Sequence, residues 1–231
     1  MTRQKKTRLN DLRGLPAYSI AEAAHYLSVP AATTRYWATG QGPYPALIDV
    51  PDNHPTLLSF LNLVELHVLA AIRRKHTVPM PKVRAAIEYL REHTRSAAGR
   101  QHPLISKQLE TDGLDLFVER YGKLVNISKA GQMAMREVMS AALHRIERDP
   151  RGIPIKLYPF TRSRIDDAPA MVVIDPALSA GRPVIAGTGL ATEVIADRYK
   201  AGESVNELAK DYERKKAEIE EAIRCELKAA A

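Results

Sequence analysis

The feature that most constrains this chain of 231 residues is a pair of short helices predicted near its N-terminus. Ser19 and Glu22 have the spacing of a capping box, which predicts a helix beginning near Ile20. Its apolar positions share one face and are Ile20, Ala23, Ala24 and Leu27. A tight turn leads into Pro30, a residue suited to the start of a second helix, predicted over residues 30–39 and ended by Gly40. Two helices joined in this way predict a helix-turn-helix, whose second helix can enter a DNA major groove.

Residues 18–24 read YSIAEAA, and residues 29–37 read VPAATTRYW. This pair of motifs resembles the opening of the MerR-type winged-helix family. The resemblance implies that Arg35 and Tyr36 face DNA and that Trp37 packs inward. With two further positions of the same predicted helix, the candidate DNA-binding residues there are Ala31, Thr33, Arg35 and Tyr36. The resemblance also implies a wing, with strands at residues 44–48 and 56–59 and a turn through residues 51–55.

Positive charge is concentrated in the first 101 residues, which hold 14 Lys and Arg against 7 Asp and Glu, whereas residues 102–231 hold 20 of each. This distribution favours a polyanion-binding module joined to a neutral one. Further candidate DNA contacts are Lys5 and Lys6 in a basic arm, and Arg73 and Arg74 near the end of a helix predicted over residues 60–76. Cations at a helix C-terminus are also expected from the helix dipole alone. Another helix is predicted over residues 81–94, followed by a linker at residues 96–99.

The middle of the chain begins with short apolar and β-prone segments. Turn residues between them predict a small hairpin or meander within residues 104–127. A capped helix is predicted over residues 128–148, and an edge strand over residues 153–158. The apolar stripe of that helix is interpreted as either core or a dimer interface, and the interface candidates are Met135, Val138, Met139 and Leu143.

Near the C-terminus, residues 172–176 read VVIDP and residues 181–190 read GRPVIAGTGL. A second capping box, Ser204 with Glu207, and an amphipathic helix from about Lys216 to Lys228 follow, which together predict a three-helix unit. The order and spacing resemble a small antitoxin domain long catalogued as being of unknown function. Together with the N-terminal motifs, the chain is similar to large VapB-type antitoxins that pair with a PIN-like ribonuclease toxin. Candidate toxin contacts are Arg162, Arg164 and Arg182, although solvated loop arginines explain the same pattern.

We expect a mainly α (α+β) protein with a basic arm over residues 1–16 and a winged helix-turn-helix over 17–95. A middle region over 102–170 and a C-terminal domain over 171–231 follow. The leading hypothesis is a homodimeric antitoxin that silences its toxin and represses its own operon by binding operator DNA. Two alternatives remain open: a MerR-like transcriptional regulator that responds to a small molecule, and an adaptor without a DNA role.

Other functions are disfavoured. No uninterrupted run of about 18 apolar residues is present to span a membrane, and residues 1–13 are basic and polar, unlike a secretory signal. We therefore expect a cytoplasmic protein without a membrane partner. Cys225 is the only cysteine, and the seven histidines show no zinc-ligand spacing. The sequence predicts no metal, no cofactor and no enzymatic activity.

Overall fold

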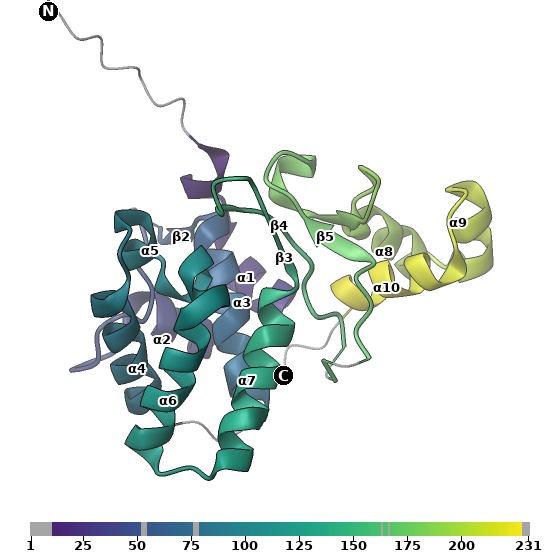
Figure 1. The fold of residues 1–231 in the computed structure, drawn as a ribbon. Coiled ribbons are helices and arrows are strands. Elements are labelled where there is room, and N and C mark those ends of the chain that lie inside the picture. Colours follow the sequence, from purple (N-terminus) through teal and green to yellow (C-terminus); the bar gives the residue numbers. More distant parts are fainter. Residues whose placement is uncertain (1–10, 52–54, 76–78, 163, 166, 228–231) are drawn as a thin grey trace, which may run out of the picture.

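The computed structural model describes residues 11–51, 55–75, 79–162, 164–165 and 167–227. It has an α+β fold in which helices predominate (Figure 1). The helices are α1 (Ile20–Leu27), α2 (Ala31–Thr39), α3 (Phe60–Lys75), α4 (Met80–His93), α5 (Ala97–Gln101), α6 (Leu114–Val125), α7 (Lys129–Leu143), α8 (Thr192–Lys200), α9 (Val205–Asp211) and α10 (Lys216–Glu226). Single 3-10 or π-helical turns lie at Leu12–Gly14, Pro103–Ile105, Leu109–Gly113 and Ser179–Gly181.

Two small antiparallel sheets connect distant parts of the chain. In the first, β1 (Tyr18–Ser19) pairs with β2 (Leu57–Leu58). The second has the order β3-β4-β5-β6. Its strands are β3 (Ile146–Arg148), β4 (Pro154–Leu157), β5 (Val172–Ile174) and β6 (Pro183–Ile185).

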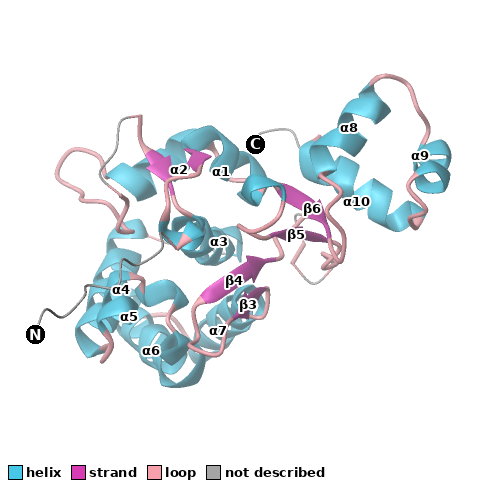
Figure 2. Ribbon diagram, turned by 90° about the horizontal axis from the view of Figure 1, so that it is seen from above, coloured by secondary structure: helices cyan, strands magenta, loops and turns pink. Residues whose placement is uncertain are grey.

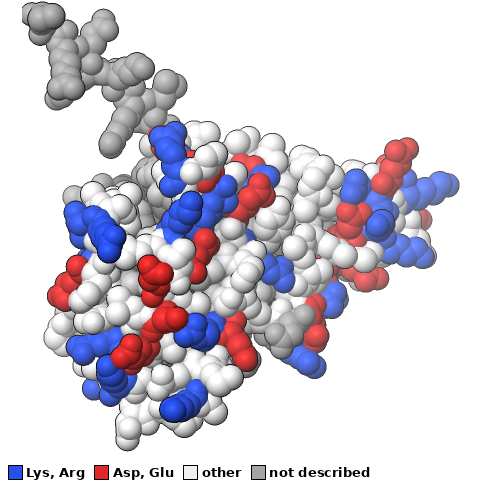
Figure 3. All heavy atoms as spheres, in the orientation of Figure 1, with Lys and Arg blue, Asp and Glu red and all other residues white. Residues whose placement is uncertain are grey.

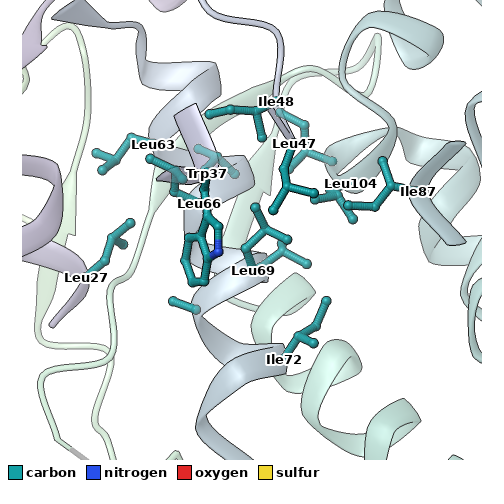
Figure 4. Close-up of a cluster of buried hydrophobic side chains, with 14 of the residues drawn as sticks. Leu27, Trp37, Leu47, Ile48, Leu63, Leu66, Leu69, Ile72, Ile87 and Leu104 are labelled. Atoms are coloured by element: carbon teal, nitrogen blue, oxygen red, sulfur yellow. The ribbon is translucent and has the colours of Figure 1, made fainter. Parts of the chain in front are cut away.

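One hydrophobic core joins the N-terminal helices to the middle of the chain. Trp37 of α2 is fully buried and lies among leucines of α3 that include Leu63 and Leu66 (Figure 4). The same cluster contains Phe117 of α6 and extends to Ile174 of β5. Residues from the predicted segments 17–95 and 102–170 therefore share a single core.

The C-terminal helices α8, α9 and α10 form a separate layer at one side of the helical body (Figures 1 and 2). They enclose their own small core, to which β6 contributes Ile185. Because β6 pairs with β5, whose Ile174 belongs to the larger core, the four-stranded sheet joins the two cores. We call β6 with α8–α10 the C-terminal unit.

The middle region differs from the sequence-based prediction. Residues 104–127 form no hairpin: a π-helical turn at Leu109–Gly113 runs directly into α6. The predicted linker is helix α5, which Ser96 caps by accepting a hydrogen bond from the backbone N–H of Gly99. The helix predicted to reach residue 148 ends at Leu143, and Ile146 begins β3. The strand predicted at residues 153–158 is β4, but it lies between β3 and β5 and is not an edge.

Candidate functional site

The two short helices predicted near the N-terminus are present as α1 and α2, and a short turn joins them. At the start of α1, the backbone N–H of Ser19 donates to a carboxylate oxygen of Glu22 (2.8 Å), and that of Glu22 donates to the Ser19 hydroxyl (3.1 Å). The helix ends at Ser28, whose left-handed backbone (φ 53°, ψ 49°) turns the chain toward α2. Pro30 occupies the N-cap position of α2 without a side-chain capping bond, and Gly40 ends the helix with a φ of +74°.

Helix α2 has one buried face and one exposed face. Thr34, Trp37 and Ala38 are buried, whereas Ala31 and Arg35 are exposed and Thr33 and Tyr36 are half-buried. Among the residues that the structure describes, Arg35 has no hydrogen-bond or ion-pair partner for its guanidinium group. The outward face of α2 therefore carries one exposed cation that pairs with none of the described residues.

The remaining candidate DNA contacts lie elsewhere. Arg73 is exposed in the last turn of α3. Arg74 belongs to the same helix, but its side chain lies outside the described part of the chain. Lys5 and Lys6 also fall outside the described residues. The first described part of the arm is fixed: Arg13 binds Asp11 and, at 2.8 Å, Asp149 in the turn between β3 and β4.

The predicted wing does not form as a hairpin of residues 44–48 and 56–59. Strand β2 pairs with β1 instead, and the loop after α2 lies against the helices. Arg84 of α4 donates hydrogen bonds to the carbonyl oxygens of Pro45 and Ala46, and Asn62 donates to that of Asp49 at 2.7 Å. Side chains of α3 and α4 thus donate hydrogen bonds to backbone carbonyl groups of this loop, in place of backbone N–H groups of a second strand. Residues 52–54 of the predicted turn lie outside the described residues.

The four residues considered for a dimer interface are core residues. Met135, Val138, Met139 and Leu143 are each at most 3% exposed, because α7 packs against α3 and α6 of the same chain. They are covered within one chain, so their assignment to a dimer interface is wrong and the core alternative is correct.

The three candidate toxin-binding arginines all have acidic partners within the chain. Arg162 donates to Glu221 of α10 through its Nε at 2.8 Å. Arg182 pairs with Glu193, and Arg164 pairs with Asp167 at 3.1 Å. The carboxylate of Glu221 is 1% exposed. Burial favours its neutral form, but the hydrogen bonds and charge of Arg162, with the charge of Arg224, keep its pKa below the usual value. Arg162 therefore neutralises a buried charge, whereas Arg164 and Arg182 remain largely exposed.

The C-terminal unit agrees in outline with the predicted three helices. Ile219, Ala222 and Ile223 of α10 are buried, whereas Leu227, directly after the helix, is 42% exposed. Thr192 lies in the first turn of α8. Its buried hydroxyl donates to the carbonyl oxygen of Pro183 and also hydrogen-bonds to Glu226, so it connects α8 to β6 and α10.

Two contacts join α1 and its preceding strand to the C-terminal unit. The hydroxyl of Tyr18 donates to the carbonyl oxygen of Gly181 at 2.9 Å. His25 Nε2 lies 3.6 Å from a carboxylate oxygen of Glu226. Neither contact was visible in the sequence, since the partners are separated by more than 150 positions.

Charged side chains elsewhere on the C-terminal unit are paired locally. Arg198 of α8 binds Glu203 and Asp211, and its guanidinium group lies 4.9 Å from the ring centre of Tyr212. Figure 3 shows basic and acidic side chains intermingled at this end of the molecule.

A search of the described helices for a membrane-spanning segment found none with the required length and hydrophobicity.

Comparison with known proteins gives a match to one family and similarity to two relatives. Residues 172–224 match the family described as "Protein of unknown function (DUF433)". The match lies within the C-terminal part. Over 224 residues, the chain is 29% identical to "Putative antitoxin VapB45" of Mycobacterium tuberculosis, with 86% of this chain and 88% of that protein aligned. It is 25% identical over 215 residues to the uncharacterized protein Rv2308 of the same organism, covering 89% of this chain and 88% of the relative.

A solved structure extends the similarity to three dimensions. The crystal structure of Rv2018 from Mycobacterium tuberculosis superposes with a TM-score of 0.68 at 26% identity. The superposition covers 90% of this chain and 98% of the other. The structural similarity thus extends well beyond residues 172–224, which the family model matches.

Proposed function

We propose that this chain is an antitoxin that binds and neutralises a PIN-like ribonuclease toxin and represses its own operon. The observation that carries the proposal is the alignment with a relative named as an antitoxin, which extends over 86% of this chain and 88% of the relative. In this proposal the chain acts by binding, without catalytic activity of its own.

The DNA role is assigned to the outward face of α2. Arg35 is exposed there without a partner among the described residues, and the first 101 residues carry the whole excess of positive charge. A recognition helix places its exposed side chains against base edges, while other cations hold the phosphate backbone. Arg73 and the arm that precedes Asp11 are the candidates for the second task.

The toxin-binding role is assigned to the C-terminal unit and the loops that lead into it. Arg164 and Arg182 are the better candidates of the three arginines, since both are more than half exposed. Each would exchange an exposed ion pair within the chain for one with the toxin, and exposed pairs contribute only about 0–1 kcal/mol. Arg162 is less suited, because its departure would leave Glu221 buried and charged.

A homodimer remains part of the proposal, because a dimer reads two half-sites about one helical turn apart. With the α7 stripe buried, the C-terminal unit is the remaining candidate interface. Val194 and Tyr199 of α8 and the adjoining Leu227 are each more than 40% exposed. Light scattering of the full chain at micromolar concentration tests this point, and a monomeric mass would contradict it.

The central experiment is co-expression of the full-length chain with a PIN-domain protein encoded beside it. We expect the pair to co-purify and the growth arrest caused by the toxin to be relieved. The same preparation should bind the promoter DNA of the pair in a fluorescence anisotropy titration. Failure of both co-purification and growth rescue would contradict the antitoxin role. The chain should not be tested as two fragments divided near residue 101, because the shared core would be cut.

A second candidate, a transcriptional regulator that responds to a small molecule, is favoured by one observation. A cleft lies between α1 and the C-terminal unit. Ligand-dependent operator affinity in the absence of any partner protein would support this alternative.

A further inference from the structure

The cleft between α1 and the C-terminal unit has a volume of about 360 Å³. Ala21, Glu22, His25 and Tyr26 line it from α1, and Arg182, Pro183, Glu193 and Glu226 line it from the other side. Figures 1 and 2 show α1 on the side of the helical body that faces the C-terminal unit. Ligand sites commonly have volumes of about 300–1,000 Å³, so the cleft can hold a small molecule.

Acidic groups dominate the lining. Three carboxylates, those of Glu22, Glu193 and Glu226, accompany the single guanidinium group of Arg182, which pairs with Glu193. Burial favours the neutral form of Glu226, but the nearby imidazole of His25 and the hydrogen bond from Thr192 outweigh it and lower its pKa, which keeps the carboxylate ionised. Each carboxylate has about four acceptor sites, so these side chains retain capacity beyond their bonds within the chain.

Tyr26 supplies an independent sign of a ligand. Its side chain belongs to a residue only 7% exposed, yet its hydroxyl has no hydrogen-bond partner among the described residues. Burial, followed by the negative charges of Glu22 and Glu226, raises the pKa of this hydroxyl, so it stays protonated. Tyr26 lines the cleft, so its hydroxyl can form a hydrogen bond with a bound ligand.

We propose that the cleft binds a small organic cation through a primary ammonium group. An ammonium group has three donors and no acceptor. These donors match the carboxylates of Glu22 and Glu226 and the hydroxyl oxygen of Tyr26. The alkyl part of the ligand lies against Ala21 and Pro183. This assignment goes beyond the proposed antitoxin function, because it adds an ammonium-binding site that the proposed function does not require.

Calorimetric titration of the full-length chain tests the site with three probes. 1,4-Diaminobutane represents a free amine, N-acetyl-lysine methylamide represents a lysine side chain of a partner protein, and 1-butanol is the uncharged control. We expect saturable binding of at least one ammonium probe with one site per chain and no binding of butanol. The tighter of the two ammonium probes identifies the source of the cation. Absence of saturable binding by both ammonium probes at millimolar concentration would overturn the proposal.

Matched variants separate the cleft from the acidic surface in general. Glu226→Gln should weaken ammonium binding at least tenfold, and Tyr26→Phe, which keeps the aromatic ring, should weaken it severalfold. Glu220→Gln makes the same charge change at an exposed position of α10 that does not line the cleft, so it should have no effect. Thermal melting checks that each variant folds. Equal affinities in the wild type, Tyr26→Phe and Glu226→Gln would overturn the assignment, and the outcome is independent of toxin and DNA binding.

Discussion

The hydroxyl of Tyr18, at the entrance to the helix-turn-helix, donates a 2.9 Å hydrogen bond to the carbonyl oxygen of Gly181 beside the C-terminal unit. The contact requires glycine. Gly181 has a φ of +78°, and a Cβ atom at this position would collide with the Tyr18 hydroxyl oxygen. This contact therefore holds β1, directly before α1, close to the segment that leads into the C-terminal unit.

Gly181→Ala should lower the free energy of unfolding by more than Tyr18→Phe does. Tyr18→Phe leaves a buried carbonyl without its donor, a loss of about 1–3 kcal/mol. Gly181→Ala combines a left-handed alanine, which costs about 1–2 kcal/mol, with the collision. In the double variant the hydroxyl oxygen is absent, so the collision is removed. Its loss in unfolding free energy, measured in urea, should therefore be smaller than the sum of the losses in the two single variants. Strict additivity would show that the contact is not formed.

Arg35→Ala should weaken operator binding by about 1–3 kcal/mol if the guanidinium group contacts a base edge. The side chain is exposed on α2, so the substitution should leave stability unchanged. Lys129→Ala at the start of α7 removes another exposed cation and serves as the control. Anisotropy titrations with operator and scrambled DNA distinguish two outcomes. Equal weakening on both DNAs would assign Arg35 to the phosphate backbone and contradict a base contact.

Removal of residues 1–10 should reduce the salt dependence of DNA binding. This segment carries Arg3, Lys5, Lys6 and Arg8, and each phosphate that they neutralise adds about 0.9 to the log–log slope. Arg13 is different, because it is held by Asp11 and Asp149 and its side chain is only 15% exposed. Arg13→Ala should therefore leave the slope unchanged. A slope that the truncation does not alter would show that the arm makes no phosphate contact.

Arg162→Ala should destabilise the chain more than Arg164→Ala. Loss of Arg162 leaves only Arg224, 3.3 Å away, to compensate the Glu221 carboxylate, which is 1% exposed. Removing one partner of a buried pair costs about 3–5 kcal/mol, and the partial exposure of Arg162 places the expected loss below that range. Arg164 is 78% exposed, and its loss should change the unfolding free energy by less than about 0.5 kcal/mol. Equal effects in urea unfolding would contradict the structural role of Arg162.

The buried pair of Glu65 and His102 predicts that stability falls as pH rises. His102 Nδ1 lies 2.9 Å from a carboxylate oxygen of Glu65. Burial raises the pKa of Glu65 above 4.5. For His102, burial alone would lower the pKa, but the hydrogen bond and charge of Glu65 outweigh it and raise the pKa above 6.5. The folded chain thus binds more protons than the unfolded chain. The stabilisation from Glu65 is lost as pH rises above 4.5, and that from His102 is lost as pH rises above 6.5.

Urea unfolding between pH 5 and 9 measures this dependence, at roughly unit intervals. The double variant Glu65→Gln/His102→Asn should flatten it, whereas His144→Asn, at an exposed position, should not. An unchanged slope in the double variant would assign the pH dependence to other groups.

Local sequence signals predicted the parts of the fold whose stabilising contacts are also local. Both serine capping boxes, at Ser19 and Ser204, are present, and Trp37 packs inward. The middle region was mispredicted because Thr111, Asp112 and Gly113 are common turn residues. Here they continue a helical path, and Leu114, Phe117, Val118 and Tyr121 carry the helical spacing of the buried face.

The contacts that unite the molecule could not be predicted in this way. Tyr18 with Gly181, and Glu65 with His102, join positions that are far apart in the sequence, so no local spacing identifies them. The same holds for Tyr26, which reads as an ordinary core residue of α1. Its unpartnered hydroxyl is visible only once the C-terminal unit lies beside it.

The pairing of β5 with β6 has a consequence for chains that lose their C-terminal part. Strand β5 is covered by β4 on one side and by β6 on the other. A truncation before Pro183 would expose the backbone N–H and carbonyl groups of Val172–Ile174 along one side of an apolar strand. Such an unpaired strand edge can form backbone hydrogen bonds with the same edge of a second truncated chain. Truncated chains should therefore accumulate as aggregates.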